Sequence, residues 1–332
     1  MDNQYKNTVI STRIRLARNI NNLPFPNRLS NQEEIYSVLV RGVEKSCKEV
    51  FGSQYDSFQM NSINNIIANA LVERHLISKD LKKSEYGWAF INKSEDVSIM
   101  VNEEDHIRVQ SIVNGFNLEA AYNTAAKVDK ALKNNLDIAY DEKLGYLTAC
   151  PTNLGSAMRA SVMLFLPGLS RLGTIENVIL QCKQAGMTIR GLYGEGSNAD
   201  GYIYQVSNQA AVALSEDEII KKVKIVVESI CKAEDKARER LKNEQNFELK
   251  NEIMISYGIL KYCVKISSKE AMQNLAMVKL GVALGYIEED IDTLNRLIVL
   301  IQPGMLCYIA KKELDPLTRD IDRASVIKNG LK

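Results

Sequence analysis

Strand-forming and helix-forming patterns occupy different parts of this chain, and this separation constrains the fold most strongly. Between about Gly87 and Val113, three segments rich in β-branched and aromatic residues follow one another: Trp-Ala-Phe-Ile, Val-Ser-Ile-Met-Val and Ile-Arg-Val-Gln-Ser-Ile-Val. From Asn243 onward the apolar spacing is helical, without strand clusters. The sequence therefore predicts a mixed domain over residues 1–242 and a helical domain over residues 243–332.

Further elements are predicted around these strands. Two capping-box pairs, Ser30 with Glu33 and Ser215 with Glu218, predict helix starts. Helices are expected over about 30–51, 61–75, 118–136, 156–166, 174–185 and 215–242, and strands over about 145–149 and 187–192. The helix at 156–166 would place Cys150 near a helix N-terminus, which favours a thiolate. Four glycines within residues 191–201 predict a mobile loop.

Size and charge exclude several classes of protein. A chain of 332 residues with 45% hydrophobic residues can bury a large core. A formal net charge of +1 creates no field that attracts nucleic acid or acidic membranes. The N-terminus lacks a signal-peptide pattern, and no apolar run approaches the roughly 18 residues of a spanning helix. We expect a cytoplasmic protein that binds neither nucleic acid nor membrane directly.

Cysteine and histidine usage narrows the chemistry. The six cysteines form no Cys-x-x-Cys pair, so neither a zinc site nor a disulfide framework is indicated. Only two histidines, His75 and His106, are present, so a three-histidine metal site cannot be built. Proton transfer is better assigned to carboxylates. The sequence has no Gly-x-x-x-x-Gly-Lys-Ser/Thr loop, so a bound nucleotide would depend on arginine side chains.

Five arginines lie in short segments beside acidic, cysteine or glycine residues. They are Arg13, Arg15, Arg108, Arg159 and Arg190. A guanidinium stays charged at any working pH and binds phosphate oxygens through two nitrogens, so a converging set predicts a polyphosphate site. The carboxylates in the same segments then require a cationic ligand.

Six segments resemble, in order, those of the phosphagen (guanidino) kinase superfamily, and most closely the bacterial protein-arginine kinases. They are Ser11-Thr-Arg-Ile-Arg-Leu-Ala-Arg-Asn, Asn102 to Arg108, Cys150-Pro-Thr-Asn-Leu-Gly, Arg190-Gly-Leu-Tyr-Gly-Glu195, Ser207-Asn-Gln and Arg319-Asp-Ile-Asp-Arg-Ala. They span the chain from about residue 8 to its end. The resemblance implies an α+β fold, with an antiparallel sheet flanked by helices and a small all-α C-terminal domain.

The resemblance also implies an activity, the transfer of the γ-phosphoryl group of MgATP to an arginine guanidinium. It assigns ATP binding to Arg13, Arg15, Arg108, Arg159, Arg190, Ser11 and His106. Glu104, Glu195 and Cys150 would hold the substrate guanidinium and act in catalysis together with Asp105. Mg²⁺ would be held mainly by ATP phosphates and water. Phosphoryl transfer needs charge neutralisation and a proton acceptor, and these arginines and carboxylates suit both tasks.

Each assignment has a structural alternative. Arg13, Arg15 and Arg18 could form a basic strand edge, residues 103–105 a solvated turn, and Cys150 an inert thiol. The C-terminal motif could be a salt-bridged helix start, with Asp320 paired to Arg323. The resemblance instead implies that Arg319, Asp320 and Arg323 bind phosphoarginine.

Two departures from the superfamily bear on the substrate. The arginine motif begins by residue 13, which leaves no room for the helical N-terminal domain with which small-molecule phosphagen kinases recognise their substrate. An arginine within a protein therefore fits better. Asn198 stands where the family usually has an acidic residue, which bears on loop closure and turnover.

The resemblance implies partners as well. The modified proteins would pass to an AAA+ unfoldase-protease in protein quality control and stress response, with a zinc-binding activator protein, and the kinase would form a homodimer. Two alternatives stay open: a kinase for free arginine or another small guanidino compound, and a weakly catalytic adaptor that binds phosphoarginine.

Overall fold

The computed structural model describes residues 5–28, 32–191, 200–212, 214–243 and 247–332. Backbone contacts divide the chain into two compact units. Unit 1 comprises Met1–Ile10, Val162–Val206 and Val226–Lys332, and unit 2 comprises Ser11–Ser161 and Ser207–Ile225. Each unit is assembled from separate stretches of the chain, and the boundary at residue 242 stays a prediction.

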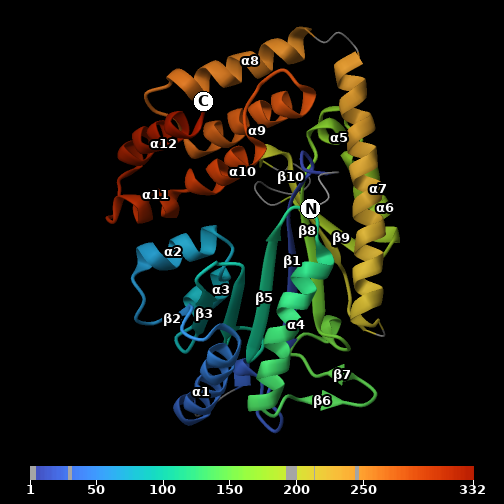
Figure 1. Cartoon of the computed structure of the whole chain (residues 1–332), viewed down its shortest axis with the longest axis vertical. Coiled ribbons are helices and arrows are strands. Elements are labelled where there is room, and N and C mark those ends of the chain that lie inside the picture. The colour runs from blue at the N-terminus through green and yellow to red at the C-terminus, as the bar shows by residue number, and fades with distance from the viewer. Residues whose placement is uncertain (1–4, 29–31, 192–199, 213, 244–246) are drawn as a thin grey trace. The chain divides into compact units, whose positions relative to one another are not determined.

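Eight strands form one sheet in the order β2-β3-β4-β5-β1-β8-β10-β9 (Figure 1). Their bounds are β1 Val9–Arg18, β2 Tyr55–Gln59, β3 Trp88–Asn92, β4 Val97–Val101, β5 Ile107–Asn114, β8 Met158–Phe165, β9 Met187–Gly191 and β10 Ile203–Asn208. The three strands predicted within residues 87–113 are confirmed as β3, β4 and β5, and their short connections make them antiparallel neighbours. β1 pairs with β5, also antiparallel.

A separate hairpin takes the place of the strand expected before Cys150. It consists of β6 (Tyr140–Asp141) and β7 (Gly145–Tyr146). Gly145 has a φ of 74°, and a Cβ atom there would lie 2.4 Å from the carbonyl oxygen of Gly155. Only glycine permits this close approach of the two segments.

The helix expected over residues 156–166 is wrong. Met158–Phe165 is the buried strand β8, which lies between β1 and β10 in the sheet. A short apolar run fits a buried strand or a helix equally well by periodicity, and pairing on both sides decides for the strand. Cys150 is followed by a single 3-10 turn, η2 (Pro151–Asn153), so the expected effect of an α-helix N-terminus on its thiol does not apply.

The helices of unit 2 largely follow the predictions. They are α1 (Gln32–Phe51), α2 (Asn65–Glu73), α3 (Lys79–Lys83), α4 (Leu118–Asn135) and the first turns of α7 (Glu216–Asn243). α2 begins later than predicted because the Asn64 side chain caps it by accepting from Ile66 N. The capping box of Ser215 and Glu218 is confirmed at α7, whereas Ser30 lies outside the described residues. α4 packs on β5 and α1 (Figure 1).

Unit 1 is helical after residue 243, as predicted. Its helices are α5 (Pro167–Arg171), α6 (Ile175–Gln184), the rest of α7, α8 (Phe247–Tyr262), α9 (Ser268–Leu284), α10 (Ile291–Leu300), α11 (Pro303–Ala310) and α12 (Pro316–Gly330). It also contains a short 3-10 turn, η3 (Asp200–Tyr202), and unit 2 contains another, η1 (Pro26–Arg28). Leu275, Leu294 and Ala324 are fully buried in the core that joins α8, α9, α10 and α12.

Within the described residues, no single helix is long and apolar enough to cross a membrane. α10 and α11, which are bent by 85° relative to each other, pass that test only as a pair, by length and composition.

Candidate active site

Three neighbouring strands bring four arginines together in unit 2. Arg13 and Arg15 lie on the same face of β1 because side chains alternate along a strand. β5 and β8 flank β1 and carry Arg108 and Arg159. Ser11 lies half-buried on β1, opposite Asn114.

The arginines act on one another electrostatically. Burial and the charges of Arg159 and Arg108 lower the pKa of Arg13 to about 10. Burial, together with the charges of Arg13, Arg108 and Arg159, lowers the pKa of Arg15 well below its ordinary value, and only Glu103 acts in the opposite direction. The buried Nε of Arg15 has no hydrogen-bond partner among the described residues. The cluster therefore concentrates positive charge where an anion would be stabilised.

Two adjacent glutamates that follow β4, Glu103 and Glu104, have different surroundings. The side chain of Glu103 is 7% exposed, lies 2.5 Å from Arg108 Nη1, and accepts a 2.7 Å hydrogen bond from Ser78 Oγ. The side chain of Glu104 is 45% exposed, and its one described contact is with Arg108 Nη2 at 3.3 Å. Glu103 holds Arg108 in place, whereas Glu104 is available to a ligand.

Asp105 is a buried carboxylate between this turn and the Cys150 segment. Its Oδ1 accepts hydrogen bonds from Asn19 Nδ2 at 2.7 Å and from Ala149 N at 2.8 Å. Its Oδ2 is buried and has no hydrogen-bond partner among the described residues. Within the described part of the chain, no group of three or more His, Cys, Asp or Glu residues could hold a metal ion.

His106 is buried, and burial lowers its pKa. Nδ1 accepts from Ile20 N at 3.2 Å, so Nε2 carries the proton and donates to the carbonyl oxygen of Pro24 at 3.1 Å. Both ring nitrogens are occupied by the backbone, and this arrangement gives no support to the expected role of His106 in ATP binding.

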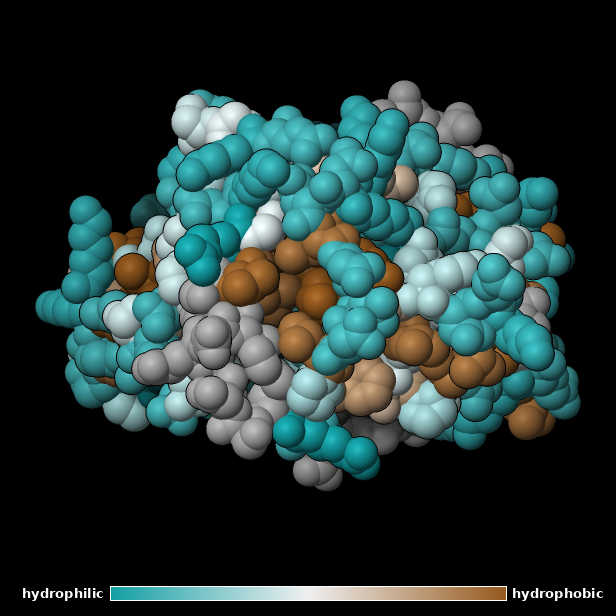
Figure 2. All heavy atoms as spheres, turned by 90° about the horizontal axis from the view of Figure 1, so that it is seen from below, coloured by the Kyte–Doolittle hydropathy of each residue, from teal (hydrophilic) through white to brown (hydrophobic). Residues whose placement is uncertain are grey.

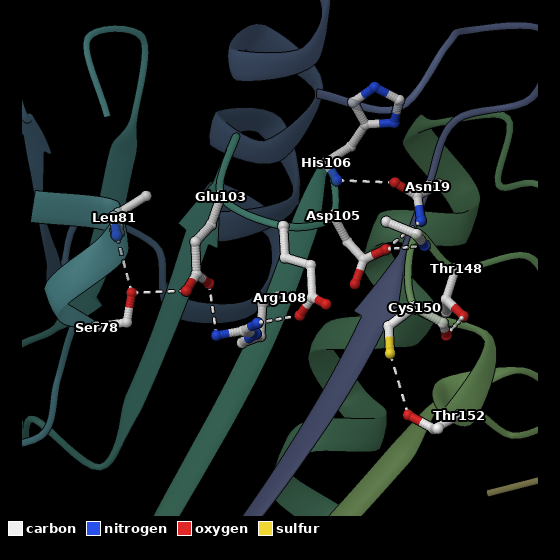
Figure 3. Close-up of polar contacts among 12 residues, drawn as sticks. Asn19, Ser78, Leu81, Glu103, Asp105, His106, Arg108, Thr148, Cys150 and Thr152 are labelled. Atoms are coloured by element: carbon white, nitrogen blue, oxygen red, sulfur yellow. Dashed lines mark hydrogen bonds and ion pairs between the residues drawn. The ribbon is translucent and has the colours of Figure 1, made fainter. Parts of the chain in front are cut away.

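Cys150 is half-buried in the segment after β7. Its Sγ lies 3.1 Å from Thr152 Oγ1, and its carbonyl oxygen accepts a hydrogen bond from Thr148 Oγ1 at 2.9 Å (Figure 3). Beside the β6–β7 hairpin, unit 2 has a cavity of about 530 Å³, lined by residues that include Tyr146, Leu154 and Val212. Figure 2 looks toward the hairpin end and shows apolar residues exposed among polar ones.

Arg18 belongs to a different environment from Arg13 and Arg15. It is fully buried, and its Nε and Nη2 donate to the two oxygens of Asp129 at 2.7 and 3.1 Å. Its guanidinium lies 3.6 Å from the ring centre of Tyr146. Arg18 is therefore part of a structural ion pair.

Arg190 is exposed on β9, in unit 1. Glu195 and Asn198, and most of the predicted glycine-rich loop, lie outside the described residues. The structure thus brings Arg13, Arg15, Arg108 and Arg159 together within unit 2 and leaves the contribution of the loop as a prediction.

Asn19 ends the first of the six segments that carry the resemblance, but no role was predicted for it, although its side chain contacts both the turn that carries Asp105 and the segment before Cys150. Its partners lie 86 and 128 residues away in the chain. Such contacts have no local periodicity, so the sequence alone could not have identified them.

The C-terminal motif lies on α12. Asp320 pairs with Arg323 at 2.5 Å, as the spacing predicted. Arg323 is 2% exposed, and its Nε and Nη1 donate to the carbonyl oxygens of Ile301 and Ile266 at 2.9 and 2.8 Å. Arg319 is half-exposed.

The sequence matches two protein families. Residues 39–237 match the ATP:guanido phosphotransferase C-terminal catalytic domain, and residues 246–332 match the Protein-arginine kinase McsB C-terminal domain. The chain is 40% identical to a protein-arginine kinase of Caldanaerobacter subterraneus subsp. tengcongensis, over 98% of this chain and 97% of the relative. It is 44% identical to a protein-arginine kinase of Clostridium acetobutylicum, over 98% and 96%.

Solved structures of guanidino kinases share the fold. A duplicated taurocyamine kinase of Schistosoma mansoni with bound transition-state-analogue components is 28% identical with a TM-score of 0.61, over 70% of this chain and 33% of that one. This chain therefore spans about a third of that duplicated protein. A lombricine kinase is 25% identical with a TM-score of 0.60, over 69% and 67%. By these matches, and with the arginine cluster and acidic turn in place, the chain belongs to the ATP:guanido phosphotransferase family, among its protein-arginine kinases.

Proposed function

We propose that this protein transfers the γ-phosphoryl group of ATP to the guanidinium of arginine residues in proteins. The observation that carries the proposal is the cluster of Arg13, Arg15, Arg108 and Arg159, in which burial and the neighbouring arginines lower the pKa of Arg13 and Arg15, beside an accessible carboxylate, Glu104. Relatives that are about 40% identical over nearly the whole chain and bear the name protein-arginine kinase support a protein substrate.

The arginine cluster would bind the ATP phosphates. Holding several half-buried guanidiniums together is unfavourable in the absence of an anion, because like charges repel one another. A polyphosphate removes this repulsion, and the fixed charges also stabilise negative charge on the γ-phosphoryl oxygens during transfer. We expect Arg190 to complete the set.

Glu104 and Cys150 would hold the substrate guanidinium, joined by Glu195 on grounds of the family resemblance. During the reaction a guanidinium nitrogen forms a bond to the γ-phosphorus, the bond to ADP breaks, and the nitrogen loses a proton. Glu104 suits the role of proton acceptor because it is exposed, whereas Glu103 is occupied by Ser78 and Arg108. Ser11 and Asp105 would support the nucleotide and the acidic turn.

Mg²⁺ would enter with ATP. We expect it to be held mainly by ATP phosphates and water, and Asp105 Oδ2, which has no hydrogen-bond partner among the described residues, would accept from a metal-bound water. The ion would neutralise phosphate charge.

The helical C-terminal region would bind phosphoarginine and form a homodimer. Arg319 and the Asp320–Arg323 pair supply cations and an acid, although Arg323 also holds two buried carbonyl groups. α8 exposes apolar side chains, which supports dimerisation through this helix. They are Phe247, Met254, Ile255, Ile259 and Tyr262.

A change of Tyr262 to lysine should shift a dimer toward monomer in sedimentation velocity. A Lys261→Ala variant on the same helix should leave the distribution unchanged, and an unaltered Tyr262→Lys dimer would exclude this face.

We also propose a place for this kinase in the cell. Phosphorylated proteins would pass to an AAA+ unfoldase-protease in the cytoplasm, during stress response, with help from a zinc-binding activator. These partners rest on the family resemblance. Phosphorylation of free arginine, and an adaptor role without catalysis, are the competing functions.

The test is mass spectrometry of an unfolded, arginine-containing protein after incubation with the enzyme, ATP and Mg²⁺, with work-up that avoids acid. Acid-labile phosphate on arginine is expected for the wild type and should be lost in Glu104→Gln. Glu142→Gln, a change of an exposed glutamate in the β6–β7 turn, is the matched control. Phosphate on free arginine alone would favour the small-molecule kinase, and no phosphate with retained phosphoarginine binding would favour the adaptor.

A further inference from the structure

Asn19 connects the two segments that carry the substrate-facing residues. It follows β1 directly and is 1% exposed. Its amide nitrogen donates to Asp105 Oδ1 at 2.7 Å and to the carbonyl oxygen of Leu147 at 2.9 Å. Its amide oxygen accepts from His106 N at 2.8 Å (Figure 3). Every donor of the side chain is used, and its oxygen has a partner.

Asp105 carries the connection onward. The oxygen that accepts from Asn19 also accepts from Ala149 N at 2.8 Å. Glu104 immediately precedes Asp105, and Cys150 immediately follows Ala149. A single carboxylate oxygen therefore ties together the backbone on either side of the proposed guanidinium site.

We propose that Asn19 is a positioning residue that sets the separation and orientation of Glu104 and Cys150 for the substrate guanidinium. This inference rests on the proposed function. In-line transfer requires the nucleophile nitrogen to be placed within a few tenths of an ångström of its productive position, and a displacement of about 1 Å can cost on the order of 10²-fold in rate. The arginine cluster lies on other residues, on β1, β5 and β8.

Asparagine is the residue type that this position requires. Asp105 is a buried acceptor, Leu147 offers a carbonyl oxygen, and His106 offers an N–H, so the central side chain must donate twice and accept once. The side-chain amide of asparagine does both at this reach. Because Asp105 Oδ2 lacks a hydrogen-bond partner among the described residues, loss of Asn19 would leave Ala149 N as the one described donor to this carboxylate.

The test compares Asn19→Asp with Asn19→Ala. Asn19→Asp keeps the shape and the acceptor for His106 N but places a second carboxylate against Asp105. The two acids would share a proton, with one raised pKa. Above that pKa the pair repels, and below it an O–H donor restores the bond. Burial lowers the pKa of His106, which favours its neutral form.

At pH 8.5 both variants should lose about 10- to 100-fold in kcat/KM for an unfolded protein substrate, with the KM for ATP within about twofold of wild type. As the pH falls, the activity of Asn19→Asp relative to wild type should rise, whereas that of Asn19→Ala should stay constant. Asn134→Asp is the matched control, since this exposed asparagine also faces a carboxylate, Glu49, at 3.4 Å.

Wild-type kinetics in both variants would overturn the proposal. So would loss of ATP binding in both, measured by calorimetry, because Asn19 would then support the fold of unit 2 as a whole. A wild-type enzyme that phosphorylates no protein arginine would contradict the proposed function instead, so the two failures are distinguishable.

Discussion

On β1, Arg15 is half-buried and Arg18 is fully buried, and replacing each by methionine should change stability in opposite directions. The pKa of Arg15 is lowered by burial and by three other arginines, and its buried Nε has no hydrogen-bond partner among the described residues. A buried donor without a partner costs about 1–3 kcal/mol. Arg15→Met fills similar space without the charge, so it should stabilise the nucleotide-free protein by about that amount.

The same change should impair ATP use. By analogy with the removal of one preorganised donor to a transition-state oxyanion, kcat/KM for ATP should fall by roughly 10²- to 10³-fold, or about 2.7–4 kcal/mol. Thermal unfolding with and without ATP reports both effects. The variant should melt at a higher temperature than wild type without nucleotide, and ATP should raise its melting temperature less.

Arg18→Met is the contrasting variant. It removes two charge-assisted hydrogen bonds from the buried Asp129, which keeps its ion pair with Lys133 at 2.5 Å, and should destabilise the protein by about 3 kcal/mol. If Arg15→Met destabilises the protein as Arg18→Met does, or leaves the response to ATP unchanged, the arginine cluster is a structural network and our interpretation of the phosphate site is wrong.

Three further outcomes are expected. Glu104→Gln should lower kcat by about 10²-fold or more in a phosphorylation assay, with ATP binding retained; near-wild-type turnover would exclude it as the proton acceptor. Arg323→Ala should lower the urea midpoint of unfolding, because two buried carbonyl groups lose their donors at a cost of about 1–3 kcal/mol each. Arg319→Ala should leave the midpoint unchanged, and equal midpoints for the two variants would refute this difference. Burial and the charge of Arg13 lower the pKa of His75 from 6.5 to about 4. The contribution of neutral His75 to the free energy of unfolding is therefore full above pH 6.5 and is lost as the pH falls through 4. His75→Asn, which suits the positive φ of 61°, should flatten that part of the pH–stability curve.

The arginine and acidic motifs could be found in the sequence because each is a short contiguous segment. Arg13 and Arg15 share a strand face by alternation alone, and residues 102–108 include both glutamates. The sequence does not show that Glu103 and Glu104 have different roles. Only the positions of Ser78 and Arg108 show that Glu103 is occupied and Glu104 is accessible.

Arg323 shows the same limit. The spacing on a helix predicted its pair with Asp320, which forms. The burial of Arg323, and its bonds to Ile301 and Ile266, come from segments 22 and 57 residues away in the chain. A loss of phosphoarginine binding in Arg323→Ala would therefore be confounded by a loss of stability, and Arg319 is the better residue for testing the pocket.

The sequence by itself determined the class of elements, the family and the residue types of the site, because periodicity and contiguous motifs are local properties. Tertiary structure decided what depends on distant partners. Met158–Phe165 is a strand because β1 and β10 lie on either side of it, Arg18 is a structural ion pair because α4 presents Asp129, and Asn19 joins two segments that no pattern relates. Buried polar groups must find partners, and where those partners lie is a property of the folded chain.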